Sequence, residues 1–482
     1  MQPSSRIACV VGLVLFVLSV WDAQNVEAFP LVVAFLSATY VATLCGVLAK
    51  RNAVPCFLVV VLFALAYFPD LVSGLTRGIQ IAPFTASPDS VLMALGALLT
   101  LLSVIVAVTL RMETSSTLRG AIHTLVHIVD GGRTGARLEV LFALTALAAV
   151  IAFGTGTWTN YSSVATTRIG GFRLELLYHP LLFAGVSVAG RRMGRTLVAP
   201  TLRWGSLMRW GIVWSSFLVL LFLLQSRRFM IFALALSAID PVLHIIQTPN
   251  ARRGIGMRLA VNATIGGLLL GGMLIGSSWW RDFGIRGVGS WGEISGTAEQ
   301  VTEARSVNTG ALAQSLSDRL RYLWIDAISI QYQPNFQQTS DLTDVLLSTV
   351  VTAMPALLLP EKARTQLLTC ESAFSQLNVS YDLSCTATSE AIIYGGLIGF
   401  IVVVVFVAIA TGFANVAYAH ASDTGLILAC CMLMQVTAIE SSAFPIVFGM
   451  RTILILGGLL GIGTWCSQLV SPSRRSLSPA NS

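Results

Sequence analysis

Long apolar runs separated by short polar connections dominate the pattern of this chain. A helix needs about 20 apolar residues to cross a bilayer, and about twelve runs approach that length. They lie at residues 7–21, 28–48, 54–72, 90–110, 138–156, 175–190, 208–225, 229–247, 259–278, 391–413, 424–439 and 447–468. The pattern predicts an all-α, polytopic integral membrane protein with about 12 transmembrane helices.

The polar connections alternate in their content of basic residues. Basic side chains gather in the connections at 50–51, 111–137, 191–209 and 252–258, and in the tail at 474–475. Cytoplasmic loops of membrane proteins are enriched in Lys and Arg. These connections and both termini are therefore predicted to be cytoplasmic, in a bacterial inner membrane. The net charge of +7 follows from this topology and needs no nucleic-acid partner.

Residues 279–390 form the longest stretch between expected spans and are predicted to be a single periplasmic loop. Residues 342–359 are apolar, but acidic and proline residues flank or interrupt them, so we expect this run to lie on the outer leaflet. The expected organisation is transmembrane helices 1–9 over 1–278, the loop over 279–390, helices 10–12 over 391–470 and a cytoplasmic tail over 471–482.

The long loop carries an amphipathic pattern and two cysteines. Apolar residues recur at three- and four-residue intervals from Leu312 to Ile330, which predicts one face of a helix. Aromatic residues such as Trp324 suit either the membrane interface or stacking on sugar rings. Cys370 and Cys385 lie in the same loop, where an oxidising compartment permits a disulfide.

An arginine pair, Arg227 and Arg228, stands between the apolar runs at 208–225 and 229–247. By the alternation above, this pair lies at the outer rim of the membrane. Charged residues at such positions are costly and are commonly functional. Snorkelling of the arginines to lipid headgroups is the alternative explanation.

The layout from about residue 157 to the C-terminus resembles the O-antigen polymerase and O-antigen ligase superfamily. The residues that carry the resemblance are Ser226-Arg227, Arg319 and Arg321 in the long loop, Ser389-Glu390 with Gly395-Gly396 at its end, and Arg168, Gly170 and Pro180 in an earlier loop. Two departures are His179 before Pro180, where the family often has asparagine, and the absence of histidine from 279–390. The second departure favours a polymerase over a ligase.

The resemblance implies transfer of a glycan from a polyprenyl-diphosphate carrier to a second lipid-linked glycan. Arginine holds phosphate oxygens bidentately, so Arg227, assisted by Arg228 or Arg319, is the candidate for the leaving diphosphate. Glu390 is the candidate general base, with Asp318, Asp382 and His179 as fallbacks. The candidate substrate-binding residues are Arg168, Arg173, His179, Arg321 and Trp324.

No cofactor or metal is expected for this reaction, because a diphosphate is already a good leaving group. The chain has no GxxxxGK[ST] motif, which argues against ATP-driven transport. The expected partners are the lipid-linked glycan and the bilayer; whether a chain-length regulator also binds is left open by the sequence. A ligase of the same superfamily, a flippase of lipid-linked sugars and a non-catalytic partner in polysaccharide secretion remain as alternatives.

Overall fold

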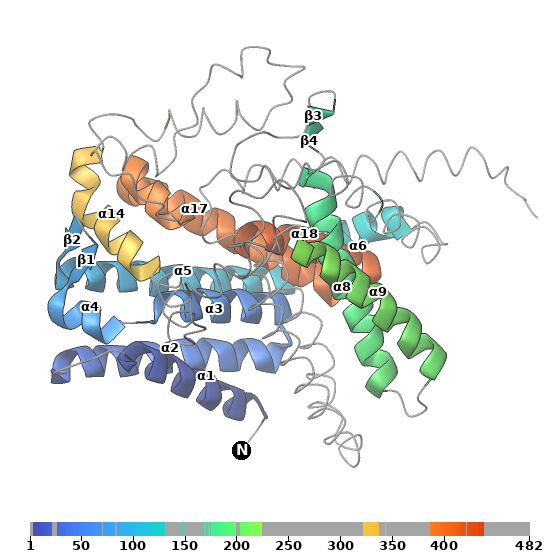
Figure 1. Ribbon diagram of the computed structural model, residues 1–482, viewed down its shortest axis with the longest axis horizontal. Helices are drawn as coiled ribbons and strands as arrows, with labels where there is room; N and C mark the ends of the chain where they lie inside the picture. Colours follow the sequence, from blue (N-terminus) through green and yellow to red (C-terminus); the bar gives the residue numbers. More distant parts are fainter. Residues whose placement is uncertain are drawn as a thin grey trace, which may run out of the picture.

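The computed structural model describes residues 3–21, 27–69, 71–81, 84–130, 147, 168–169, 172–173, 175–198, 203–223, 322–336, 343, 386–420 and 422–437. In this part the chain is almost entirely helical, with two short hairpins, and the helices pack against one another (Figure 1). The expectation of a helical fold is confirmed there, and the hairpins are an addition to it.

The first two helices, α1 (Pro3–Val20) and α2 (Ala28–Arg51), pack together through small residues. A Cβ added at Gly12 would lie 3.1 Å from the Cβ of Ala42, and one added at Gly46 would lie 3.2 Å from that of Ala8. Small residues let helix backbones approach closely in membranes, where packing rather than hydrophobic exclusion drives association.

The next apolar run forms two short helices where the pattern over 54–72 predicts one span. Helix α3 (Val54–Tyr67) is followed by α4 (Leu71–Arg77), and the two differ in direction by 44°. Strand β1 (Ile79–Ile81) then pairs antiparallel with β2 (Phe84–Ala86). The run therefore bends before it enters a hairpin.

Helix α5 (Pro88–Thr114) starts at a defined cap. The hydroxyl of Ser87 accepts a hydrogen bond from the backbone N–H of Ser90 at 3.2 Å, and Pro88 occupies a first-turn position that needs no N–H donor. Helix α6 (Ser116–Asp130) follows after a single residue. The connection expected over 111–137 is thus helical along much of its length.

Helices α8 (Glu175–Val198) and α9 (Trp204–Leu223) form a hairpin. The short strands β3 (Arg168–Ile169) and β4 (Phe172–Arg173) precede it and pair with each other. Gly185 on α8 makes room for the ring of Phe217 on α9, since a Cβ there would lie 3.1 Å from the ring.

The last three helices of the described part are α14 (Tyr322–Phe336), α17 (Ala387–Ala419) and α18 (Asp423–Thr437). Helix α17 is broken at Gly396, whose φ of 53° and ψ of −135° are open to glycine but strained for other residues. The break brings the two parts of α17 into close contact, because a Cβ on Gly399 would lie 2.2 Å from the carbonyl oxygen of Ala391.

Three described helices are long and apolar enough to cross a membrane: α2, α5 and α17. The bent pair α3–α4 makes a fourth if it counts as one span. The other described helices cover expected spans at 7–21, 175–190, 208–225 and 424–439. The expected spans at 229–247, 259–278 and 447–468, nearly all of that at 138–156, and most of the loop over 279–390 lie outside the described residues.

The two ends of the described bundle carry different sets of residues. At one end Glu113 of α5 interacts electrostatically with Arg51 of α2 and Arg119 of α6, so these three helices come together there. The rings of His123 and His420 lie 5.3 Å apart at the same end. We call this the basic end. Helix α14, the first hairpin and the start of α17 lie together at the opposite end (Figure 1).

Candidate functional site

The start of α17 is built around Thr386, which caps the helix. Its side-chain oxygen accepts a hydrogen bond from the backbone N–H of Ser389 at 2.9 Å, and the Ser389 hydroxyl accepts one from the N–H of Thr386 at 2.8 Å. This reciprocal capping box satisfies two N–H groups that a helix start leaves without partners. The first turn of α17 is therefore capped by side chains of the turn itself.

The same threonine joins α17 to the loop helix α14. The hydroxyl of Thr386 donates to Oδ1 of Asp326 at 2.7 Å, and that of Thr388 donates to Oδ2 at 2.9 Å. Tyr67, the last residue of α3, also donates to Oδ2 at 3.0 Å. We call Tyr67, Asp326, Thr386 and Thr388 the Asp326 cluster. It ties together three segments that are far apart in the sequence.

All four side chains of the cluster are buried, and Asp326 is 2% exposed. Burial raises the pKa of Asp326 from its ordinary value of 3.8 to about 6, although the hydroxyls of Thr386, Thr388 and Tyr67 favour the charged form and lower it. The carboxylate also lies at the start of α17, where the helix dipole favours a negative charge. Asp326 is therefore mostly ionised at neutral pH but titrates close to it.

Glu390, the candidate base, lies in the first turn of α17 and is 2% exposed. Thr388 and Ser389, directly before it, are also buried. The structure thus brings this predicted residue beside the Asp326 cluster. Two acidic residues are buried where α14 meets the start of α17, a helix apolar enough to cross a membrane.

Helix α14 is fastened to this end of the bundle along its length. Gln331 accepts hydrogen bonds from the hydroxyls of Ser87 and Ser90, at the start of α5. The ring of Tyr332 lies edge-on against Phe84 of β2, with their centroids 5.2 Å apart. Trp324, a predicted sugar-stacking residue, is half-buried and packs against the core.

The remaining predicted residues are described only in part or not at all. Arg168 and Arg173 face each other as paired positions of β3 and β4, and His179 belongs to α8, but their side chains are not described. The residues outside the described part are Arg227, Arg228, Arg319, Arg321, Asp318, Asp382, Cys370 and Cys385. The diphosphate site and the disulfide therefore stay predictions.

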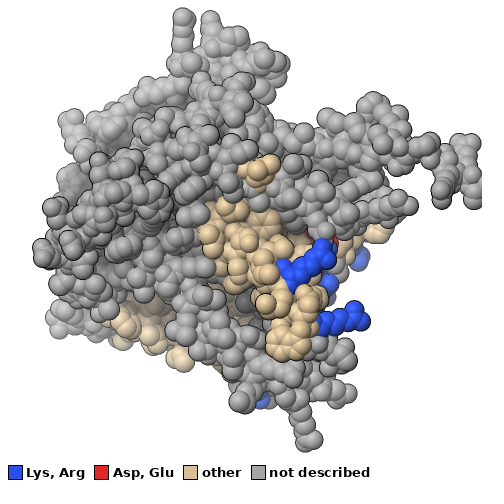
Figure 2. Space-filling model, turned by 45° about the vertical axis from the view of Figure 1, so that its right-hand side comes forward, with Lys and Arg blue, Asp and Glu red and all other residues tan. Residues whose placement is uncertain are grey.

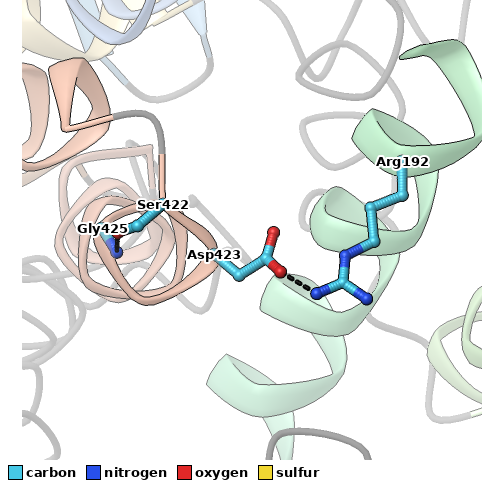
Figure 3. A network of polar contacts seen from close by, with 4 residues as sticks. All are labelled: Arg192, Ser422, Asp423 and Gly425. Carbon is cyan, nitrogen blue, oxygen red and sulfur yellow. Dashed lines mark hydrogen bonds and ion pairs between the residues drawn. The ribbon is translucent and has the colours of Figure 1, made fainter. Parts of the chain in front are cut away.

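A second polar cluster lies at the basic end. Arg192 of α8 forms an ion pair with Asp423, the first residue of α18 (Figure 3). Arg191 is 4% exposed, and its guanidinium carbon lies 5.2 Å from the ring centroid of Tyr418. These contacts join α8 to the turn between α17 and α18.

Metal-binding groups are not grouped within the described residues. No set of three His, Cys, Asp or Glu side chains is placed there to hold a metal ion.

Sequence reasoning overlooked Asp326, the centre of the buried network. Asp326 interrupts the apolar pattern of the loop helix between Leu323 and Ala327, and a charged residue within a helix face of this kind is the signal that was available. Its hydroxyl partners lie 60 to 259 residues away in the sequence, so nothing local marked them.

No protein-family model, curated protein or solved structure matches this chain.

Proposed function

We propose that this chain is a membrane glycosyltransferase that polymerises polyprenyl-diphosphate-linked oligosaccharide repeat units at the periplasmic face. The observation that supports it is the burial of Glu390 beside the Asp326 cluster, where loop helix α14 meets the start of α17. A base that activates a sugar hydroxyl has to be partly shielded from water and held in place. This position offers both.

In the proposed reaction, the acceptor hydroxyl attacks the anomeric carbon of the donor glycan. The new C–O bond forms as the bond to the diphosphate breaks, and the diphosphate leaves with the electron pair. Glu390 takes the proton of the hydroxyl, and Arg227 with Arg228 or Arg319 meets the charge that develops on the diphosphate. A single displacement of this kind inverts the configuration at the anomeric carbon.

The Asp326 cluster positions Glu390 in this proposal and does not accept the proton itself. The carboxylate of Asp326 already receives three hydroxyl hydrogen bonds, which occupy both of its oxygens. The role of Asp326 is to fix α14 on the first turn of α17, because Thr386 both caps that turn and donates a hydrogen bond to Asp326.

The first test is complementation of a chromosomal deletion, with surface and lipid-linked glycans separated on a gel. Wild-type protein is expected to restore a ladder of polymer, and Glu390→Gln is expected to lose it by about 100-fold or more, as for removal of a general base. Glu390→Asp should retain part of the activity. Glu27→Gln is the matched control, since Glu27 is an exposed carboxylate just before α2.

Three outcomes would contradict the proposal. A full ladder from well-expressed Glu390→Gln would show that Glu390 is not the general base. A full ladder from Arg227→Ala would show that Arg227 does not hold the diphosphate. If the deletion instead traps finished polymer on its lipid carrier, the protein is a ligase of the same superfamily.

A transporter of lipid-linked sugars is the second candidate, and the break in α17 favours it. Many transporters bind substrate at discontinuous helices, and α17 is interrupted at Gly396 while α3–α4 is bent by 44°. In that case the deletion strain would accumulate repeat units on the cytoplasmic leaflet only. Accessibility of the lipid-linked sugar to an external lectin in spheroplasts distinguishes the two.

A further inference from the structure

Two histidines from distant parts of the chain meet at the basic end. His123 belongs to α6, and His420 is the C-terminal cap of α17. Their ring centroids lie 5.3 Å apart, with the ring planes inclined at 66°. Two imidazoles bound to one tetrahedral metal ion at N–metal distances of about 2.0–2.1 Å have centroids about 5 Å apart. Edge-to-face aromatic pairs span the same distances, but three features around these rings are those of metal ligands.

The first feature is a hydrogen bond that orients the ring of His420. This ring hydrogen-bonds the backbone of Arg119, which lies one turn before His123 on α6. Histidines that bind a metal ion through one nitrogen commonly donate the other N–H to a carbonyl or carboxylate, which fixes the ring and its tautomer. His123 is exposed and His420 is half-buried, so a metal ion can reach the pair from solvent.

The second feature is the spacing of histidines in α6. A further histidine, His127, follows His123 by four residues within this helix. Positions i and i+4 lie on the same face of a helix, and two histidines at this spacing bind one Zn²⁺ in helical metal sites. The side chain of His127 is not described, so its part follows from the spacing alone. The described side chains thus supply two imidazoles, and the sequence supplies a third.

The third feature is the charge around the pair. Figure 2 shows lysine and arginine side chains on this side of the described surface, with little acidic surface beside them. Glu113 is already engaged by Arg51 and Arg119. A hard cation such as Mg²⁺ prefers carboxylate oxygens, whereas neutral imidazole suits Zn²⁺, Cu²⁺ and Ni²⁺. His420 also stands at the C-terminal end of α17, where the helix dipole favours a cation. These surroundings suit a transition-metal ion.

We propose that His123 and His420 bind one divalent transition-metal ion such as Zn²⁺, with His127 as the third imidazole. Three imidazoles leave one position of a tetrahedral ion, which water can occupy. The metal ion joins α6 to the end of α17 and so holds α6 on the bundle. This site lies at the basic end and does not depend on the proposed glycosyltransferase activity.

The test is isothermal titration of the purified full-length protein with Zn²⁺, using a purification tag that contains no histidine. The variants are His123→Gln, His127→Gln and His420→Gln. The matched control is His244→Gln, which removes one imidazole from a different expected span. Size-exclusion elution confirms that each variant is folded, and titration of wild type with Mg²⁺ gives a control without mutation. The absorption spectrum of the Co²⁺ form identifies the ligands, because thiolates add a charge-transfer band that imidazoles lack.

Wild type and His244→Gln are expected to bind one Zn²⁺ per chain and no Mg²⁺. Each of the three variants should lose affinity for Zn²⁺ by about tenfold or more, and Zn²⁺ should raise the Tm of wild type more than that of the variants. Folded wild type that binds no Zn²⁺, or unchanged affinity in His123→Gln or His420→Gln, would overturn the site and leave the rings as an aromatic pair. Unchanged affinity in His127→Gln would overturn the three-histidine set. A thiolate band in the Co²⁺ spectrum, or a dimer formed only with Zn²⁺, would assign the metal ion to other ligands and overturn the proposal.

Discussion

Replacing Asp326 with asparagine removes one buried charge while leaving a side chain of the same shape. The amide oxygen of asparagine can still accept from Thr386. Its NH₂ group can donate to the hydroxyl oxygen of Thr388 or Tyr67, each of which is free to rotate its proton. The main change is therefore the loss of a carboxylate whose ionisation in the folded protein is costly.

The magnitude follows from the pKa of Asp326. Burial raises this pKa from 3.8 to about 6. Each pKa unit corresponds to about 1.4 kcal/mol, so full ionisation destabilises the folded state by about 3 kcal/mol relative to the protonated acid. Because the folded pKa is above the unfolded one, this cost is absent below about pH 4. It develops as the pH rises from about 4 to about 6, between the unfolded and folded pKa values, and is constant above that range.

The assay is denaturant unfolding of wild-type and Asp326→Asn protein in mixed micelles between about pH 4 and pH 8. Other titrating groups are common to both proteins and cancel in the difference. Relative to the variant, wild type should lose about 2.5 kcal/mol across this range, with a midpoint near pH 5, halfway between the unfolded and folded pKa values of Asp326. A protonated-carboxyl infrared band of the folded protein that titrates near pH 6 and is missing from the variant would assign the group directly.

Two parallel pH profiles would refute the reasoning. They would mean that Asp326 has the same pKa in the folded and unfolded states, and hence that the carboxylate is not held in a buried cluster. A difference profile of the opposite slope would mean that a nearby cation stabilises the ionised form of Asp326.

Three further substitutions test other parts of the described structure. Tyr67→Phe removes a hydroxyl donor to Asp326 and should cost about 1.5–3 kcal/mol of unfolding free energy above pH 7, with less effect in acid, where the carboxyl is neutral; unfolding at both pH values checks this. Gly396→Ala should cost about 1–3 kcal/mol through backbone strain, whereas Gly395→Ala, where φ is not positive, should be close to neutral; unfolding of both variants measures the contrast. Asp423→Asn should cost no more than about 1 kcal/mol, because its ion pair with Arg192 is partly exposed, and molar salt should abolish the difference from wild type.

The length of the apolar runs was the sequence property that best predicted the helices of the structure. The runs predicted at 28–48 and 90–110 are helices α2 and α5; α2 extends past its run at the C-terminal end, and α5 extends past its run at both ends. Run length predicts helices well because, in a membrane, a helix allows each segment to satisfy its own backbone hydrogen bonds. Over 54–72 the apolar run contains two helices, α3 and α4, that differ in direction by 44°, and run length does not encode such a bend.

The candidate site was predictable only where its signal was local. Glu390 stood out because it precedes an apolar run and a glycine pair, and the structure buries it in the first turn of α17. Asp326 was not found because its environment is set by Tyr67 and Thr386, which are distant in sequence. The break at Gly396 shows the same limit, since Gly395 and Gly396 look alike in the sequence and only one has positive φ.

The position of Asp326 also constrains how the proposed reaction divides its charges. The start of a helix attracts anions, and a diphosphate would otherwise be drawn to the first turn of α17. An ionised Asp326 bonded to Thr386 and Thr388 already supplies the negative charge there and repels a second anion. In the proposed reaction the leaving diphosphate is therefore held elsewhere, by arginines such as Arg227. Asp326→Asn should accordingly not rescue Arg227→Ala, because opening the helix start to anions would place the diphosphate where Glu390 is needed for the acceptor.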